Sequence, residues 1–142
     1  LKETFQQLYY ANVALEGMVL KPNMVISGMK CPKQASVDEV AQRTVEILKR
    51  CVPSAVPGIA FLSGGQSDEQ ATAHLNAMNA EYELPWALTF SYGRALQAAP
   101  QKAWSGKAEN VTLAQRAFTH RAKMNGLAAV GKWTAELEKK AA

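Results

Sequence analysis

The sequence has 142 residues, 48% hydrophobic and 20% charged, which is an ordinary composition for one globular domain with a single core. The net charge of +4 is modest and the basic residues are scattered among acids, which argues against a nucleic-acid partner and favours a small anionic ligand. No apolar run approaches the ~20 residues that cross a bilayer, and the N-terminus lacks a signal pattern, so we expect a cytoplasmic protein without a membrane partner.

The chain opens on a helical pattern in which Leu1, Phe5, Leu8 and Tyr9 share one face. The pattern has no start signal, and Leu1 is not a methionine. We therefore expect the sequence to be a piece of a longer protein.

An apolar run that ends abruptly in Lys21 follows at residues 15–21. The run predicts a buried strand, and Pro22 cannot donate to a strand ladder, so the strand should end at about Lys21. In parallel α/β proteins this end of a strand carries the chemistry, and a lysine held there among apolar neighbours loses hydration and becomes a nucleophile towards carbonyls. Two interpretations of Lys21 follow: a strand-end lysine that reaches into water, which the stretch by itself favours, and a Schiff-base lysine.

Six further elements are predicted from periodicity and end signals. Continuous apolar runs predict a strand buried on both faces at 58–62 and another buried strand at 86–90, and capping boxes at Ser36 and Ser67 begin two of the helices. Pro100 should kink or restart the helix that contains it, and the last helix carries an apolar face. The predicted strands are 58–62 and 86–90, the predicted helices are 36–51, 67–79, 95–102 and 107–127, and the apolar face of the last helix comprises Val111, Ala114, Phe118 and Ala122.

Strands that alternate with helices predict βαβ units on a parallel sheet, hence an α/β fold. Three strands are few for such a sheet, because both flanking strands would leave unpaired edges. We therefore expect either part of a larger β/α barrel or association with other chains.

The loops after the second and third strands both carry groups suited to phosphate. Ser63 and Gly64 begin a Ser-Gly-Gly turn that can turn backbone N–H groups towards an anion, and Gly93 precedes Arg94, whose guanidinium matches phosphate oxygens. Neighbouring parallel strands lie ~5 Å apart, so these loops should be adjacent. The alternatives are a tight turn before a helix for the first loop and a surface ion pair for Arg94.

The cysteines and histidines indicate no further site. Cys31 and Cys51 form no C-x-x-C pair and are expected to be free thiols. His74 and His120 are isolated from other ligand residues, so we expect no metal site and interpret both as ordinary surface or core histidines.

Several ordered blocks carry a resemblance to a known family. They are LEG at 15–17, LKPNM at 20–24, FLSGGQS at 61–67, LNAMN at 75–79 and WALTFSYGRALQ at 86–97. The chain resembles the C-terminal part of a class I, Schiff-base-forming fructose-bisphosphate aldolase, from Leu1 to about Trp133. The resemblance implies that residues 1–142 are one segment of that family's eight-stranded barrel, containing its last three β/α units.

The resemblance also implies roles for individual residues. Lys21 matches the lysine that forms the imine with dihydroxyacetone phosphate. The substrate phosphate would be bound by residues of the two loops, with two further residues flanking them. The phosphate-binding residues are Ser63, Gly64, Gly93 and Arg94, and the flanking residues are Leu62 and Ser91.

The implied activity is the reversible cleavage of fructose 1,6-bisphosphate, a phosphorylated sugar, in glycolysis and gluconeogenesis. It implies a lyase without cofactor or metal, and a homo-oligomer in the complete protein. The family's carboxylates and second catalytic lysine lie on the first five strands, outside this chain, so the isolated segment should be inactive.

One function from a different class remains the main alternative. The partial barrel could be a noncatalytic module that binds phosphorylated ligands or assembles with partner chains. A transaldolase-like Schiff-base enzyme fits the second phosphate loop poorly, and a metal-dependent aldolase is disfavoured by the isolated histidines.

Overall fold

The computed structural model describes residues 1–139 as helices arranged around one three-stranded sheet. The elements are α1 (Lys2–Tyr10), the 3₁₀ turn η1 (Leu15–Gly17), β1 (Val19–Leu20), α2 (Val37–Cys51), β2 (Gly58–Phe61), α3 (Asp68–Glu81), β3 (Ala87–Phe90), α4 (Arg94–Trp104), the 3₁₀ turn η2 (Ala108–Asn110), α5 (Val111–Ala128) and α6 (Ala135–Glu138). The predicted alternation of strands and helices is confirmed.

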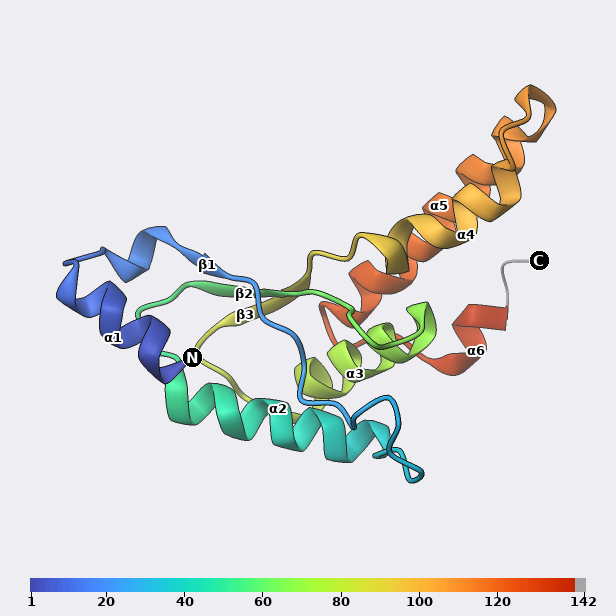
Figure 1. Ribbon diagram of the computed structural model, residues 1–142. Coiled ribbons are helices and arrows are strands. Elements are labelled where there is room, and N and C mark those ends of the chain that lie inside the picture. The colour runs from blue at the N-terminus through green and yellow to red at the C-terminus, as the bar shows by residue number, and fades with distance from the viewer. Residues whose placement is uncertain (140–142) are drawn as a thin grey trace.

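The three strands are parallel and lie in the order β1-β2-β3, which is also their order along the chain (Figure 1). Val19 of β1 is opposite Gly58 of β2, and Phe61 of β2 is opposite Phe90 of β3. Consecutive parallel strands joined by helices are the arrangement found in a β/α barrel. The predicted βαβ units are therefore confirmed, and all three carboxyl ends lie at one edge of the sheet.

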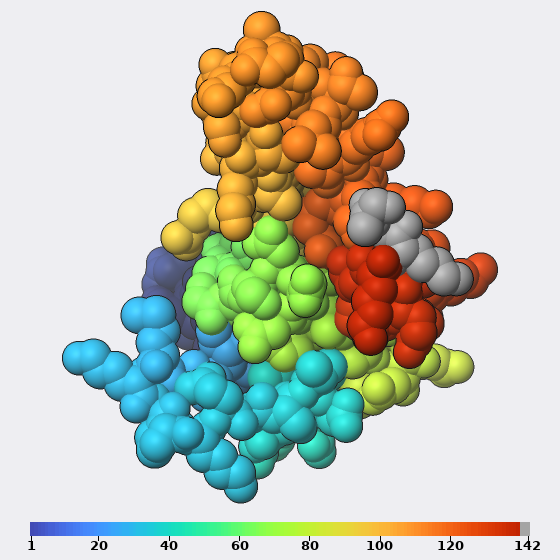
Figure 2. All heavy atoms as spheres, turned by 90° about the vertical axis from the view of Figure 1, so that its right-hand side faces the viewer, coloured from blue at the N-terminus to red at the C-terminus, as the bar shows by residue number. Residues whose placement is uncertain are grey.

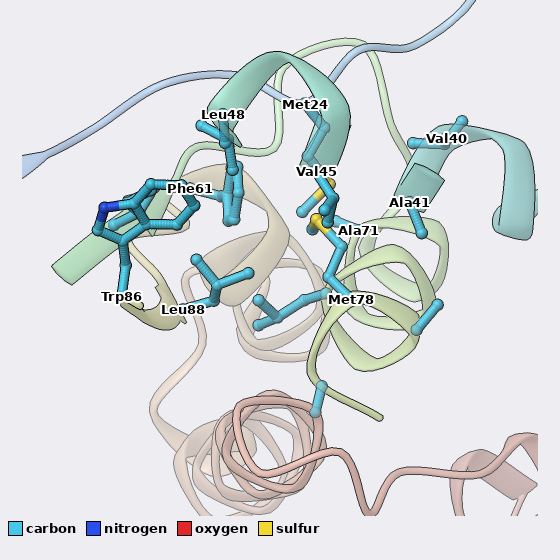
Figure 3. Packing of buried hydrophobic residues seen from close by; sticks show 14 of the residues in the cluster. Met24, Val40, Ala41, Val45, Leu48, Phe61, Ala71, Met78, Trp86 and Leu88 are labelled. Carbon is cyan, nitrogen blue, oxygen red and sulfur yellow. The ribbon is translucent and has the colours of Figure 1, made fainter. Parts of the chain in front are cut away.

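The hydrophobic core lies between one face of the sheet and the helices α2 and α3 (Figure 3). Ile59 and Phe61 of β2 are fully buried, and Leu88 of β3 is nearly so. Trp86 closes one end of this core, where its indole N–H donates to the carbonyl of Pro53 at 2.9 Å. The helices contribute buried apolar side chains at helical spacing: Val40, Ala41, Val45, Leu48, Ala71, Leu75 and Met78.

Of the two predicted capping boxes, the one at Ser67 is complete and the one at Ser36 has only its serine hydrogen bond among the described residues. Ser67 forms the complete capping box of α3: its Oγ accepts from the N–H of Gln70, and the Gln70 side chain accepts from the N–H of Ser67. In α2, Ser36 Oγ accepts from the N–H of Glu39 at 3.2 Å. These caps place the start of both helices within a residue or two of the predicted positions.

The opposite face of the sheet is open. Val19 is 62% exposed, and Ala87 and Thr89 of β3 are also exposed. None of the three strands predicted to be buried is thus fully covered on both faces, and in β2, for which burial on both faces was predicted, Gly58 and Ala60 are only partly buried. The reason is that the core helices α2 and α3 pack on one face only, so the strand side chains alternate between buried and exposed.

The first strand is also shorter than predicted. Leu15–Gly17 forms the 3₁₀ turn η1, so Glu16 lies before the strand and not inside it. β1 contains only Val19 and Leu20. Its end directly before Lys21 agrees with the prediction made from Pro22.

Helices α4 and α5 form a hairpin that projects from the rest of the molecule (Figures 1 and 2). The predicted restart at Pro100 does not occur, since α4 continues through it to Trp104. Packing of α4 against α5 along its length compensates for the stability that is lost with the hydrogen bond removed by the proline. Val111 and Phe118 of the predicted apolar face are 43% and 44% exposed, while the buried residues of α5 lie in its second half. Within residues 1–139, no helix has the length and apolarity needed to cross a bilayer.

The short helix α6, which the sequence analysis did not predict, is held by an ion pair. Glu138 accepts two hydrogen bonds from the guanidinium of Arg121 on α5, at 2.5 and 3.0 Å, and one from the indole of Trp133 at 2.8 Å. Arg121 also donates to the hydroxyl of Thr72 on α3 at 3.0 Å. We call Arg121, Glu138 and Thr72 the clasp, because it joins α3, α5 and α6.

Candidate active site

The residues singled out in the sequence follow the three strands at one edge of the sheet. Lys21 comes directly after β1, residues 62–64 after β2, and residues 91–94 after β3 and into α4. The parallel register brings the three strand ends side by side. The active ends of β/α barrels are built in this way.

Backbone hydrogen bonds continue past the strand ends and hold these segments together. The N–H of Leu62 donates to the carbonyl of Pro22 at 3.0 Å, and the N–H of Ser91 donates to the carbonyl of Phe61 at 2.8 Å. Leu62 thus connects the first loop to the lysine segment, and Ser91 connects the second loop to the end of β2.

Lys21 itself is exposed. Its exposure in the described part of the chain agrees with a strand-end lysine that reaches into water, and the loss of hydration expected for a Schiff-base lysine is not found there. The cause is the open face of the sheet, which leaves the apolar surroundings of Lys21 incomplete. The neighbouring Asn23 links the lysine segment to the first loop, where its side-chain amide donates to the carbonyl of Gly64 at 3.1 Å.

The turn after β2 is tight at Gly64 and needs a glycine conformation at Gly65. A Cβ on Gly64 would lie 3.1 Å from Leu62 Cδ1. Gly65 has φ +76°, and a Cβ there would lie 2.8 Å from Ile26 Cδ1. The Ser-Gly-Gly turn therefore has a conformation that residues with side chains adopt only with strain.

The loop after β3 leads into α4. Gly93 occupies the N-cap position of α4, without a side-chain cap, and its carbonyl accepts from the N–H groups of Leu96 and Gln97. Arg94 is the first residue of the helix and is exposed. Within residues 1–139 it has no ion-pair partner, so the alternative of a surface ion pair finds no support there.

One pocket of 390 Å³ contains residues from both loops. It is lined by Met29, Ser63, Gly65, Gln66, Asp68, Arg94 and Ala95. The predicted pair Ser63 and Arg94 is thus brought together, while Lys21 is not among the lining residues. Asp68 brings a carboxylate to the same pocket, and burial raises its pKa, although the charge of Arg121 acts in the opposite direction. A positive side chain, a hydroxyl and glycine backbone around one pocket are suited to an anion.

One contact of this region was missed in the sequence. His74, interpreted there as an ordinary surface or core histidine, is 6% exposed, and its Nδ1 lies 2.7 Å from Oε1 of Gln66 in the wall of the pocket. Burial lowers the pKa of His74. The sequence offered one signal for this contact. Gln66 directly follows the glycine turn, and His74 lies about two helical turns further along the chain.

Tyr92 lies in the second loop and its hydroxyl is already engaged. Its Oη donates to the carbonyl of Ala71 at 2.8 Å, and burial raises its pKa. Tyr92 therefore holds the loop against α3, and its hydroxyl is not available for proton transfer.

The structure also describes the cysteines and the second histidine. Cys31 and Cys51 are free thiols, as predicted. His120 lies 3.4 Å from Glu138 beside the clasp. No group of three or more His, Cys, Asp or Glu side chains in the described part of the chain could hold a metal ion.

The comparison with protein families and with known proteins gives one consistent result. The family model for class I fructose-bisphosphate aldolase matches residues 1–142. The chain is 58% identical over 134 residues to a probable class 1 fructose-bisphosphate aldolase of Xylella fastidiosa, covering 94% of this chain and 40% of that protein. It is 53% identical to fructose-bisphosphate aldolase B of Sparus aurata, with 94% of this chain and 37% of that protein covered.

A solved structure agrees with these relatives. Fructose-bisphosphate aldolase from Plasmodium falciparum, in a complex with TRAP and a small-molecule inhibitor, superposes with a TM-score of 0.91 at 48% identity, over 94% of this chain and 39% of that chain. The sheet described above is thus part of a β/α barrel, and the chain spans about 40% of the length of the relatives it matches. The chain belongs to the class I fructose-bisphosphate aldolase family, of which it represents the C-terminal part.

Proposed function

We propose that the full-length protein carrying this segment reversibly cleaves fructose 1,6-bisphosphate to dihydroxyacetone phosphate and glyceraldehyde 3-phosphate. Residues 1–142 would form the C-terminal portion of its barrel. The observation that supports this most is the pocket shared by Ser63 and Arg94, in loops hydrogen-bonded through Leu62 to the segment that carries Lys21. Membership of the aldolase family supports it independently.

In this proposal Lys21 is the covalent catalyst. Its neutral amine attacks the ketose carbonyl, and loss of water gives a protonated imine. The bond between the third and fourth carbons then breaks: its electron pair moves into the imine to form an enamine, and a base takes the proton of the fourth-carbon hydroxyl. Glyceraldehyde 3-phosphate leaves as the aldehyde. Protonation of the enamine and hydrolysis of the imine release dihydroxyacetone phosphate and restore the amine.

The two loops would bind the phosphate next to that imine. Arg94 supplies a guanidinium without an ion-pair partner in the described residues, and Ser63 supplies a hydroxyl. Gly64 and Gly93 are each next in the chain to one of these two residues but do not line the pocket, and we propose that their backbone approaches the phosphate in the complete barrel. Because phosphate binding orients the ketose, these residues would set the position of its carbonyl relative to Lys21.

The remaining catalytic groups would come from outside this chain. Cleavage needs a base and imine formation needs proton transfers, each contributing about 10²–10⁴-fold. Glu16 lies in η1 before the strand, while Asp68 and Glu69 lie at the start of α3. We propose that the strands absent from this segment carry these groups and also complete the surroundings of the exposed Lys21.

We further propose that the complete protein is a cytoplasmic homo-oligomer whose ligand is a phosphorylated sugar and which binds neither nucleic acid nor membrane. The modest net charge of +4 supports the absence of a nucleic-acid partner. Sedimentation of the full-length protein measures the oligomeric state, and a monomer at micromolar concentration would contradict this part of the proposal.

Substitution of Lys21→Arg tests the proposed function. A guanidinium stays protonated and cannot form an imine, so turnover of fructose 1,6-bisphosphate by the full-length protein should be lost although the charge is kept. Lys49→Arg, at an exposed position in the last turn of α2, is the matched control and should retain activity. Retained turnover in Lys21→Arg would contradict the proposal.

The exposure of Lys21 favours one alternative, a noncatalytic module that binds phosphorylated ligands or assembles with partner chains. In that case the full-length protein would bind dihydroxyacetone phosphate without forming a covalent adduct. Lys21→Arg would then leave this binding unchanged.

A further inference from the structure

A second, smaller cavity lies behind the wall of the phosphate pocket. It has a volume of 90 Å³, and its lining includes Gly65, Gln66 and His74. Gly65 and Gln66 also line the phosphate pocket, whereas His74 does not. Gly65 and Gln66 therefore form a wall between the two cavities. His74 contacts that wall from the side of the smaller cavity, away from the ligand.

The contact itself is a short hydrogen bond. His74 is 6% exposed on α3, and its Nδ1 lies 2.7 Å from Oε1 of Gln66. Because an amide oxygen can only accept, Nδ1 of His74 carries the proton and donates. A buried helix is thus connected to the glycine turn that precedes it.

Gln66 transmits this contact to the turn. Its backbone N–H donates to the carbonyl of Ser63 at 3.2 Å and closes the turn around the two glycines. Its side-chain Nε2 is buried and has no hydrogen-bond partner among the described residues. The side-chain amide is thus held through its Oε1, and its NH2 group, in the wall of the pocket, stays without an acceptor in the described part of the chain.

A glycine turn needs such support if it is to bind an anion well. Glycines have the largest conformational freedom of any residue, so an unsupported Ser-Gly-Gly turn would lose more entropy when a ligand orders it. A side chain fixed from behind reduces that loss without touching the ligand.

We propose that His74 is a positioning residue, which acts through Gln66 to hold the Ser63–Gly65 turn in the conformation that binds the substrate phosphate. This inference rests on the proposed function, because it assumes that the pocket of Ser63 and Arg94 takes that phosphate. It assigns no direct contact with substrate to His74.

The test compares two ligands that differ by one phosphate, bound to the full-length protein. Calorimetry measures the Kd of dihydroxyacetone phosphate and of dihydroxyacetone for the wild type and for His74→Leu. Loss of one hydrogen bond should weaken binding of the phosphorylated ligand about fivefold and leave the other ligand unchanged. The KM for fructose 1,6-bisphosphate should rise by a similar factor with little change in kcat.

Three further variants separate positioning from a general loss of stability. His74→Asn keeps a donor near the place of Nδ1 and should restore tight binding. His120→Leu removes the other histidine, outside the pocket, and should have no effect on either Kd. In a Gln66→Leu background, His74→Leu should cause no additional loss, because the residue through which it acts is gone.

The outcomes distinguish this inference from the proposed function. If Arg94→Ala weakens binding of dihydroxyacetone phosphate but His74→Leu does not, the phosphate pocket stands and the role of His74 is wrong. Equal weakening of both ligands in His74→Leu, or a full effect of His74→Leu in the Gln66→Leu background, would also overturn it. If the wild type does not bind dihydroxyacetone phosphate, the proposed function fails and this inference fails with it.

Discussion

Removal of the clasp carboxylate should destabilise the C-terminal part of this segment strongly. The side chains of Arg121 and Glu138 are only 6% and 12% exposed, and Glu138 accepts from both Arg121 and Trp133. In Glu138→Ala, the guanidinium would remain buried with Thr72 as its partner. Breaking a buried pair from one side costs about 3–5 kcal/mol, and we expect about 3 kcal/mol because the short helix α6 can move and admit water.

Native-state hydrogen exchange of the full-length protein, read by mass spectrometry, measures this loss in α5 and α6. Glu83→Ala, at an exposed loop position, is the matched control and should change stability by less than about 0.5 kcal/mol. Exchange rates in Glu138→Ala equal to those of the control would show that the clasp contributes nothing and would refute this reasoning.

The same clasp has a defined pH dependence. Burial raises the pKa of Glu138, but hydrogen bonds from Arg121, Trp133 and His120, together with the charge of Arg121, outweigh it and hold the pKa below its ordinary value of 4.5. A carboxyl group whose pKa is lower in the folded state contributes its full stabilisation at pH values above its ordinary pKa. This stabilisation is lost as the pH falls through the pKa of the folded state. The difference in free energy of unfolding between the wild type and Glu138→Gln should therefore be constant at neutral pH and shrink below about pH 4.5.

Three further predictions concern the pocket and the segment. Arg94→Ala should weaken binding of phosphorylated ketoses by about 1.5–3 kcal/mol and leave unphosphorylated ketoses unaffected, as measured by inhibition constants; equal losses would give Arg94 a structural role. Gly65→Ala should cost about 1–3 kcal/mol in urea unfolding, since φ is +76° and the new Cβ would meet Ile26, and an unchanged midpoint would contradict the strain. The isolated 142 residues should self-associate and fail to cleave fructose 1,6-bisphosphate, while a fragment with the missing strands should restore some activity; a monomer with the activity of a complete aldolase would refute this.

Local signals in the sequence were sufficient for most of the fold. Ser36 and Ser67 identified the helix starts, because a serine cap satisfies N–H groups within the same helical turn. The apolar run at 58–62 predicted β2 to within one residue. Such signals depend on neighbouring residues only, which is why they could be recognised without the structure.

The features that were missed depend on contacts between distant parts of the chain. Nothing near residue 138 indicates that Glu138 meets Arg121, and nothing near residue 74 indicates that His74 supports a loop. The open face of the sheet was missed for a related reason. An apolar run predicts burial, but a strand taken from a larger barrel keeps its composition when the elements that cover it are outside the chain.

The candidate site was predicted in its residue types but not in its full geometry. The order of the strands brought Ser63 and Arg94 into one pocket, as the parallel sheet required. The exposed state of Lys21 was one of two states that the sequence left open, because hydration depends on everything that surrounds the strand end and not on the strand alone.

The most direct test of the account is chemical trapping of the imine on Lys21. The full-length protein is reduced with sodium borohydride in the presence of dihydroxyacetone phosphate, digested, and analysed by mass spectrometry. We expect irreversible loss of activity and a single adduct on the peptide that contains Lys21, with no adduct when dihydroxyacetone phosphate is omitted. The absence of an adduct, or an adduct on Lys30 or Lys33 instead, would contradict the assignment of Lys21 as the covalent catalyst.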